Sequence, residues 1–324
     1  AAGNLDLRKA IANKLQIQNN LNYEFENVMV TNGAKQAIYN LFQVLLNTGD
    51  EVIIPSPYWL SYPQMVRLAG GKPIFTNSSA EDGFKINIED LKSKISSKTK
   101  FIIINSPNNP TGRVMSKEEL LQIADLAREN PNINILSDEI YELILKKEFK
   151  HYSLSSLAND LKDRIFIING FAKGWAMTGW RIGYLVGPKD VIKASSALQS
   201  QSTSNVCSFV QKGALEALKI NNEFFSMINS HYDQRRSLLY EGLKNINGIY
   251  IEEPNGAFYA FPRLPNSSIT SVDFCNKALQ DYGLVVVPGK AFGADECIRI
   301  SCAASEIKIK DGLQRLEKAI SNYY

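Results

Sequence analysis

Short apolar runs alternate with segments of helical periodicity over the first two-thirds of the chain. The apolar runs are closed by turn-forming residues such as Asn and Pro, which is typical of buried strands. This alternation predicts an α/β fold with a largely parallel sheet between layers of helices. The expected strands span residues 28–31, 50–54, 101–104, 133–136 and 164–168.

Helical periodicity is clearest in two segments between these strands. Ser116 precedes Glu119 by three positions, which is the capping-box pattern and predicts a helix that runs from there toward Arg128. The other helix, over residues 34–46, places one apolar stripe on Ala37, Leu41, Val44 and Leu45.

The pattern changes near residue 220, where a long helical segment begins and a smaller α+β region follows it. We therefore expect a domain boundary within 218–225, with a large domain over 1–220 and a small C-terminal domain over 221–324. The chain opens directly on a helical pattern without an initiating methionine, so we also expect an upstream N-terminal segment.

Composition narrows the class of protein. The 324 residues are 44% hydrophobic and 21% charged, which fits a globular chain of about two domains. The net charge of +3 comes from 36 basic and 33 acidic residues, so the chain lacks the basic footprint of a nucleic-acid-binding protein. No apolar run is long enough to span a membrane, and no signal-peptide pattern is present.

Cysteine and histidine are sparse. The chain has four separated cysteines without a C-x-x-C pair and only two histidines, which argues against a zinc site. So few cysteines in a chain of this size are typical of a reducing compartment, and we expect a cytoplasmic protein.

Chemistry-bearing residues follow the predicted strands. In open α/β sheets, ligands bind at the carboxyl ends of the strands. We therefore expect these residues to converge on one cleft: Gly33, Trp59, Asn109, Asp138 and Lys173.

Lys173 stands alone in the apolar, glycine-rich run 169–184, with Arg181 eight positions later. Loss of hydration favours the neutral amine, which can attack a carbonyl and form a Schiff base. An arginine offers a permanently charged fork for a phosphate, and the two together are what pyridoxal phosphate requires. The alternative is a lysine that extends from a buried strand and turn to solvent.

Two further groups suit such a cofactor. The helix start at Gly33, Ala34 and Lys35 presents free N–H groups to a phosphate, although an ordinary turn and cap would have the same sequence. Asp138 can keep a pyridine nitrogen protonated, with Tyr141 near the ring oxygen; the alternative is an Asp that caps a following helix.

Three more positions have competing interpretations. Trp59, or less certainly Tyr58, can stack on a planar ring or simply fill a core. Asn109 can donate a hydrogen bond to a ring oxygen or belong to a plain turn. Arg299 alternates with apolar neighbours in a strand-like run, so it faces either a substrate carboxylate or an internal salt-bridge partner.

Taken together, these residues resemble the class I and II aminotransferases, which are fold type I pyridoxal phosphate enzymes, and most closely their bacterial aspartate aminotransferase subgroup. The resemblance extends over essentially the whole chain in order and spacing. The matching runs are 31–37, 55–59, 106–112, 137–141, 173–181 and 299–301.

The resemblance implies a role for each residue around the cofactor ring. Lys173 forms the Schiff base and moves the proton, and Asp138 pairs with the pyridine nitrogen. Tyr141 and Asn109 hydrogen-bond the ring oxygen, and Trp59 stacks on the ring. The fold it implies is a three-layer large domain with a mostly parallel central sheet, plus a smaller α+β C-terminal domain.

The resemblance also implies how anionic groups are held. Gly33, Ala34, Lys35 and Arg181 surround the cofactor phosphate, and Arg299 clamps the substrate α-carboxylate with Asn109 beside it. In the aspartate subgroup the lysine at the place of Lys35 helps to recognise a distal carboxylate. The substrate is therefore expected to be a dicarboxylic amino acid.

A homodimer with shared active sites is implied as well, in which the polar stretch 200–205 reaches the partner's site; by composition alone this stretch is a solvated loop. Two departures from the family stand out. Gly170 and Ala172 occupy places where many members carry phosphate-binding serines. The N-terminal segment that closes over the site in the family precedes Ala1, and we expect it to be disordered in an open form.

The predicted activity is amino transfer between aspartate and 2-oxoglutarate with ping-pong kinetics, in which Lys173 takes the Cα proton and returns it to the cofactor. The alternatives are a prephenate, aromatic or kynurenine aminotransferase, or a β-lyase on the same fold. A more distant alternative is a non-enzymatic regulator, for which a DNA-binding appendage is expected and none is seen. Turnover of a panel of amino acids distinguishes these enzymatic activities from one another. A Schiff-base absorbance band that depends on Lys173 distinguishes an enzyme from the non-enzymatic regulator.

Overall fold

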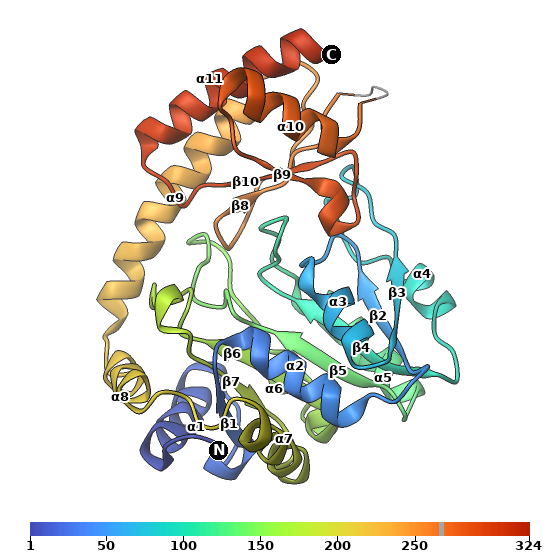
Figure 1. The fold of residues 1–324 in the computed structure, drawn as a ribbon, viewed down its shortest axis with the longest axis vertical. Helices are drawn as coiled ribbons and strands as arrows, with labels where there is room; N and C mark the ends of the chain where they lie inside the picture. Colours follow the sequence, from blue (N-terminus) through green and yellow to red (C-terminus); the bar gives the residue numbers. More distant parts are fainter. Residues whose placement is uncertain (266–268) are drawn as a thin grey trace.

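A seven-stranded sheet lies at the centre of the larger part of the molecule (Figure 1). The computed structural model describes residues 1–265 and 269–324. The strand order is β1-β7-β6-β5-β4-β2-β3. Strand β7 pairs antiparallel with β1 and β6, and the other pairs are parallel, so the sheet is mostly parallel as predicted. The strands are β1 (Val28–Thr31), β2 (Glu51–Pro55), β3 (Lys72–Thr76), β4 (Thr99–Asn105), β5 (Asn134–Asp138), β6 (Ile165–Gly170) and β7 (Gly183–Val186).

Helices cover both faces of this sheet and give it three layers. One face packs against α2 (Ala34–Leu45), α3 (Ser61–Leu68) and α7 (Lys189–Ser202). The other packs against α1 (Leu5–Asn19), α4 (Ile88–Ser93), α5 (Lys117–Glu129), α6 (Leu154–Leu157) and α8 (Ser208–Ala217). The alternating apolar runs of the sequence are the strands that both layers bury.

The capping box predicted from the sequence is confirmed at the start of α5. Ser116 Oγ accepts from the backbone N–H of Glu119, and the Glu119 carboxylate accepts from the N–H of Ser116, so the predicted capping box begins α5. The β3 strand was not predicted, because its residues lie at the edge of the sheet and are mostly half-buried or exposed.

The C-terminal part has its own small sheet and apolar core. Its sheet has the order β8-β10-β9, and three helices pack on it (Figure 1). The elements are α9 (Asn222–Lys244), β8 (Tyr259–Ala260), α10 (Ser271–Tyr282), β9 (Val287–Pro288), β10 (Ile298–Ser301) and α11 (Glu306–Tyr323).

Helix α9 belongs to both cores. Phe225 near its start packs in the core of the large sheet, whereas Leu239 and Leu243 pack in the C-terminal core. We propose two domains over 1–220 and 221–324, with the change of packing partner inside the first half of α9.

The carboxyl ends of the parallel strands face the C-terminal sheet. The segments that follow β1, β2, β4, β5 and β6 meet at this edge, between the two parts of the molecule (Figure 1). Within the described residues, no helix combines the length and the apolar character that a membrane crossing needs.

Candidate active site

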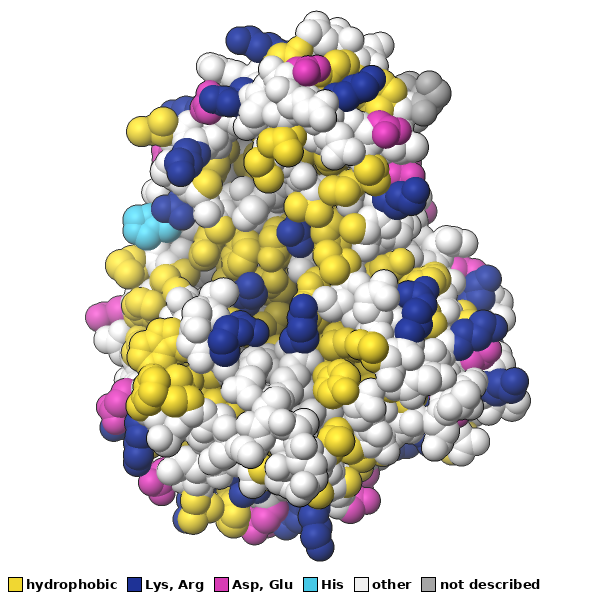
Figure 2. All heavy atoms as spheres, in the orientation of Figure 1, with side chains coloured by type: hydrophobic (Ala, Val, Ile, Leu, Met, Phe, Trp, Pro, Cys, Tyr) yellow, Lys and Arg dark blue, Asp and Glu magenta, His cyan; other side chains and the backbone are white. Residues whose placement is uncertain are grey.

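A cavity of about 320 Å³ opens where these segments meet. Figure 2 shows a hollow in the middle of this face, with an apolar floor and several basic side chains around it. Its size falls in the range of small-molecule sites. Every residue of the predicted site lines it: Gly33, Ala34, Lys35, Trp59, Asn109, Asp138, Tyr141, Lys173, Arg181 and Arg299.

The N-terminus of α2 forms one wall of the cavity. Gly33 is the N-cap with φ +81°, a conformation that favours glycine. A Cβ at this position would lie 2.7 Å from Nη2 of Arg181, so the close approach of the arginine also requires glycine. The first N–H groups of this helix and its positive dipole end create an anion site beside the guanidinium.

Arg181 is held in a conformation that non-glycine residues rarely adopt. Its φ is +53°, directly after the short 3-10 turn Thr178–Trp180, and its Nη1 donates to the carbonyl oxygen of Thr178 at 3.0 Å. Backbone strain of this kind persists only where the surroundings fix it, and it clusters at ligand sites.

Lys173 lies three residues after β6 and reaches into the same space. Its Nζ lies 5.7 Å from the ring centroid of Tyr141 and 5.4 Å from that of Phe258. Burial, with Arg181 and Arg299 nearby, lowers the pKa of Lys173, and Asp138 partly opposes this effect. These surroundings increase the fraction of the neutral, nucleophilic amine.

Asp138 is the buried carboxylate of the cavity, at the end of β5. Its Oδ2 accepts from Tyr62 Oη at 2.6 Å, and its Oδ1 accepts from the N–H of Ile140 at 3.3 Å. Burial raises the pKa of Asp138 to about 6, while the hydrogen bond from Tyr62 holds it down. The residues after Asp138 form turns, so the alternative of an aspartate that caps a helix is wrong.

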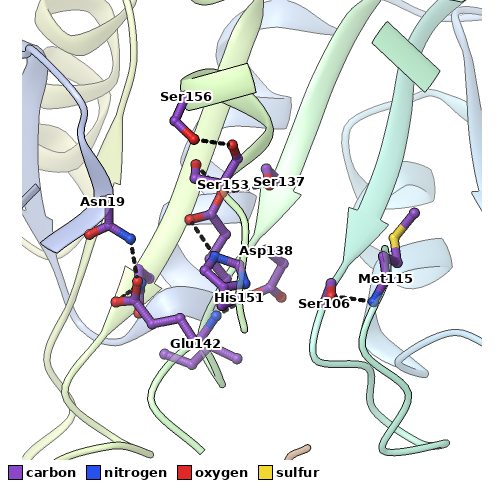
Figure 3. A network of polar contacts seen from close by, with 12 residues as sticks. Asn19, Ser106, Met115, Ser137, Asp138, Glu142, His151, Ser153 and Ser156 are labelled. Atoms are coloured by element: carbon purple, nitrogen blue, oxygen red, sulfur yellow. Dashed lines mark hydrogen bonds and ion pairs between the residues drawn. The ribbon is translucent and has the colours of Figure 1, made fainter. Parts of the chain in front are cut away.

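Behind the cavity, the buried carboxylate of Glu142 joins three segments. Glu142 pairs with Lys14 of α1 and accepts from Asn169 Nδ2 at 2.7 Å. It also accepts from Asn19 Nδ2 at 2.7 Å (Figure 3). Asn169 in turn accepts from the N–H of Gly170, at the start of the loop that carries Lys173. Glu142 therefore fixes α1 and the end of β6 against the turn that follows Asp138.

Glu139 makes a second set of buried contacts on the same turn. It accepts from Ser137 Oγ at 2.8 Å and Ser153 Oγ at 2.7 Å, and His151 Nε2 lies 3.2 Å away (Figure 3). Glu139, Glu142 and His151 lie close enough to share a cation, but Lys14 already supplies a positive charge to Glu142, and we assign no metal site.

Arg299 on β10 faces the cavity from the C-terminal part. Its Nη1 donates to Asn109 Oδ1 at 2.9 Å, and its Cζ lies 4.6 Å from the ring centroid of Tyr259 and 4.8 Å from that of Phe292. Within residues 1–265 and 269–324 it forms no ion pair, so the alternative of an internal salt bridge is wrong. A half-buried arginine without an acidic partner is available for an anionic ligand.

The charge of the cavity is strongly unbalanced. It is lined by four cations and by one carboxylate, that of Asp138. In the part of the chain that the structure describes, none of the four cations is in an ion pair. The cations are Lys35, Lys173, Arg181 and Arg299. Such a site is built for a ligand with several negative charges.

Comparison with known protein families identifies the family to which this chain belongs. The family model described as "Aminotransferase class I and II" matches residues 1–316. The chain belongs to this family.

Similar proteins and solved structures match nearly the whole length of this chain. A probable aspartate/prephenate aminotransferase of Rickettsia typhi is 45% identical over 325 residues, which cover 97% of this chain and 81% of the relative. The structure of aspartate aminotransferase from Thermus thermophilus with maleate is 41% identical, with a TM-score of 0.93 over 98% of this chain and 82% of that one. An aromatic aminotransferase from Pyrococcus horikoshii is 37% identical, with a TM-score of 0.95 over 99% and 87%.

Trp59 and Tyr58, the two residues predicted as candidates to stack on the cofactor ring, have different surroundings. Trp59 lines the cavity, with Lys35 Nζ 5.0 Å from its ring centroid. Tyr58 does not line it and stacks on Phe75, with centroids 4.9 Å apart and an interplanar angle of 21°.

Several cavity residues carry no signal in the sequence. Tyr62 reaches Asp138 only because α3 turns its phenol back toward the end of β5. Tyr259 comes from β8, far along the chain, and contacts Tyr141 through their hydroxyls. The lining residues that sequence reasoning missed are Leu60, Tyr62, Asn105, Ile140, Thr178 and Tyr259.

Proposed function

We propose that this aminotransferase holds pyridoxal phosphate in the cavity and transfers the amino group of aspartate to 2-oxoglutarate. The observation that supports it best is the set of four cations, none of which forms an ion pair with a described residue, around one buried carboxylate. A cofactor phosphate and the carboxylates of a dicarboxylic substrate supply the negative charges that this arrangement lacks.

The residues fit the two ends of the cofactor. Gly33, Ala34, Lys35 and Arg181 would hold the phosphate, because a bare glycine, a helix N-terminus and a guanidinium meet there. Asp138 would pair with the pyridine nitrogen: its pKa of about 6 leaves it mostly ionised at neutral pH. With Gly170 and Ala172 in place of hydroxyl residues, phosphate binding would rest more on backbone N–H groups and Arg181.

Bound pyridoxal phosphate supplies an aldehyde that condenses with amines and a protonated ring that withdraws electrons. Lys173 would hold it covalently and then take the proton from the substrate Cα, a task that suits a lysine with a lowered pKa. Tyr141 and Asn109 would donate to the ring oxygen, and Trp59 would stack on the ring.

Substrate selection would rest on two cations that line the cavity from different parts of the fold, α2 and β10. Arg299, held by Asn109 and two aromatic rings, would bind the α-carboxylate bidentately. Lys35, exposed above Trp59, would meet the distal carboxylate. The aspartate aminotransferase names of similar proteins support a dicarboxylic substrate.

Prephenate is the second candidate acceptor. The relative from Rickettsia typhi is named for both aspartate and prephenate. Prephenate also carries two carboxylates, so Lys35 and Arg299 suit it, and the apolar floor of the hollow suits its ring. This alternative keeps the same cofactor and the same site.

Half-reaction kinetics with a panel of amino acids test the proposal on purified full-length enzyme. Aspartate and glutamate should convert the cofactor fastest, with aromatic amino acids slower. Negligible turnover of both dicarboxylic donors would refute the substrate assignment. Comparable acceptance of prephenate and 2-oxoglutarate would place the enzyme with the dual-specificity relatives.

The assembly and location are further proposals. We propose a homodimer with shared sites, in which the exposed stretch 200–205 at the end of α7 contacts the partner. We also propose a cytoplasmic enzyme, because all four cysteines are free.

A further inference from the structure

Tyr259 enters the cavity from the C-terminal part of the molecule, in a position fixed by backbone contacts. On β8 it pairs with Ser301 of β10, the strand that also carries Arg299. Just before it, the N–H of Gly256 donates to the carbonyl oxygen of Gly112 at 2.7 Å, which ties this segment to the large sheet's loops. The phenol of Tyr259 therefore has little freedom to move away from the site.

The hydroxyl of Tyr259 meets the hydroxyl of Tyr141 at 2.9 Å. Both side chains are buried, with 7% and 4% of their surface exposed, so water does not compete for this bond. A phenol has one proton to donate. If Tyr259 donates to Tyr141, the proton of Tyr141 is free to point into the cavity, and its donation is strengthened by the bond it accepts.

The ring of Tyr259 meets the guanidinium of Arg299, whose Cζ lies 4.6 Å from the ring centroid. Phe292 lies on Arg299 at 4.8 Å, and Asn109 Oδ1 accepts from Nη1. Contact with aromatic faces restricts a planar guanidinium to few orientations. The ring therefore helps to orient the remaining N–H groups of the Arg299 guanidinium toward the cavity.

We propose that Tyr259 is a positioning residue for both halves of the site, with the hydroxyl directing the proton of Tyr141 and the ring orienting Arg299. The proposal rests on the proposed function, in which Tyr141 serves the cofactor and Arg299 the substrate. Because the two roles belong to different atoms of one side chain, two substitutions separate them.

The hydroxyl is tested with Tyr259→Phe in the cofactor-loaded enzyme, by following the cofactor's absorbance against pH. A donor at the ring oxygen favours the more negatively charged, deprotonated form of the bound cofactor. Loss of the hydroxyl should therefore raise the midpoint of the titration, by roughly half a unit to one unit. In a Tyr141→Phe background, Tyr259→Phe should cause no further change, because its partner is gone.

The ring is tested by comparing Tyr259→Phe with Tyr259→Leu. The phenylalanine keeps an aromatic face for Arg299, so KM for the amino acid should change by less than about twofold. The leucine removes it, and KM should rise about fivefold while the titration midpoint matches that of the phenylalanine variant.

Tyr232→Phe is the matched control, since the Tyr232 hydroxyl has no hydrogen-bond partner among the described residues and should leave the midpoint unchanged. In the two Tyr259 variants, the other charged and titratable groups that face the tyrosine pair are unchanged: Tyr62, Asp138, Lys173, Tyr232, Arg299 and Cys302. An unchanged midpoint in Tyr259→Phe, or equal KM in the two Tyr259 variants, would overturn the inference. Failure of the wild type to bind the cofactor would instead refute the proposed function.

Discussion

At the scale of single residues, the charge of Asp138 depends on one neighbour. Tyr62 and Asp138 are almost completely buried, at 1% and 4% exposure, and the 2.6 Å bond between them opposes the effect of burial on the carboxylate pKa. A carboxylate in this position must be ionised to pair with a protonated ring nitrogen.

Tyr62→Phe should weaken cofactor binding by about tenfold at neutral pH, because a hydrogen bond to a buried charged group is lost. The loss should grow as the pH falls, since the pKa of Asp138 rises further without its donor. The measurement is the cofactor dissociation constant as a function of pH. Tyr58→Phe, which alters a phenol stacked on Phe75 outside the cavity, is the control and should leave the constant unchanged.

Asp138→Asn should change how the stability of the cofactor-free protein depends on pH. Burial raises the pKa of Asp138 from 3.8 to about 6 in the folded state, so the wild type loses stability as the pH rises from about 4, where Asp138 ionises in the unfolded chain, to about 6, where it ionises in the folded protein. Asparagine removes this penalty. Relative to wild type, the variant should gain up to about 3 kcal/mol as the pH rises from roughly 4 to 6, and the difference should stay constant at higher pH.

Urea unfolding of both cofactor-free proteins across this pH range measures the effect. A stability difference that does not change with pH would show that Asp138 titrates normally in the folded protein.

The sequence was most informative about residues whose chemistry is specific. Lys173, Asp138 and Arg299 stand out because a buried charge needs a reason, and the structure places all three in one cavity. Tyr62 and Tyr259 could not be predicted in the same way. Tyrosines fill cores throughout such folds, and only the tertiary arrangement brings these two hydroxyls to a polar partner.

At the scale of elements, the N-terminus of α2 depends on Gly33. Its φ is +81°, and a Cβ added to it would lie 2.7 Å from Nη2 of Arg181, so a side chain there would strain the backbone and displace the guanidinium. The sequence pattern located this helix start, but a glycine before a helix does not reveal that an arginine from another loop packs on it.

Gly33→Ala should lose about 1 kcal/mol of stability from the backbone and should also displace Arg181, weakening cofactor binding at least tenfold. Gly49→Ala is the matched control: it has φ +91° with nothing within 4 Å, so it tests backbone strain alone. Thermal unfolding and cofactor titration of both variants measure the two effects. Equal cofactor affinity in both variants would contradict the role of this helix start.

At the scale of the whole molecule, buried polar contacts hold distant segments together behind the cavity. Lys14 of α1 pairs with Glu142, and side-chain exposure of the two is only 4% and 5%. Sequence periodicity predicted the layers and the mostly parallel sheet, because these follow from apolar runs. It could not predict this pair, since a lysine within an amphipathic helix normally faces solvent.

Lys14→Met should destabilise the fold by about 3–5 kcal/mol, because it leaves Glu142 charged and buried without its partner. Lys219→Met, which breaks a surface pair with Glu216 at 65% and 68% exposure, should cost less than about 1 kcal/mol. Denaturant unfolding compares the two. Similar losses in both variants would mean that the buried pair contributes no more than a surface one.

The proposed function depends above all on Lys173 as the amine that holds pyridoxal phosphate and moves the substrate proton. A decisive test is to load the full-length enzyme with the cofactor, reduce it with borohydride and identify the modified lysine by peptide mass spectrometry. We expect stoichiometric modification of Lys173 and none in Lys173→Ala. Modification of Lys35 instead, or equal modification of the Lys173→Ala variant, would contradict this assignment.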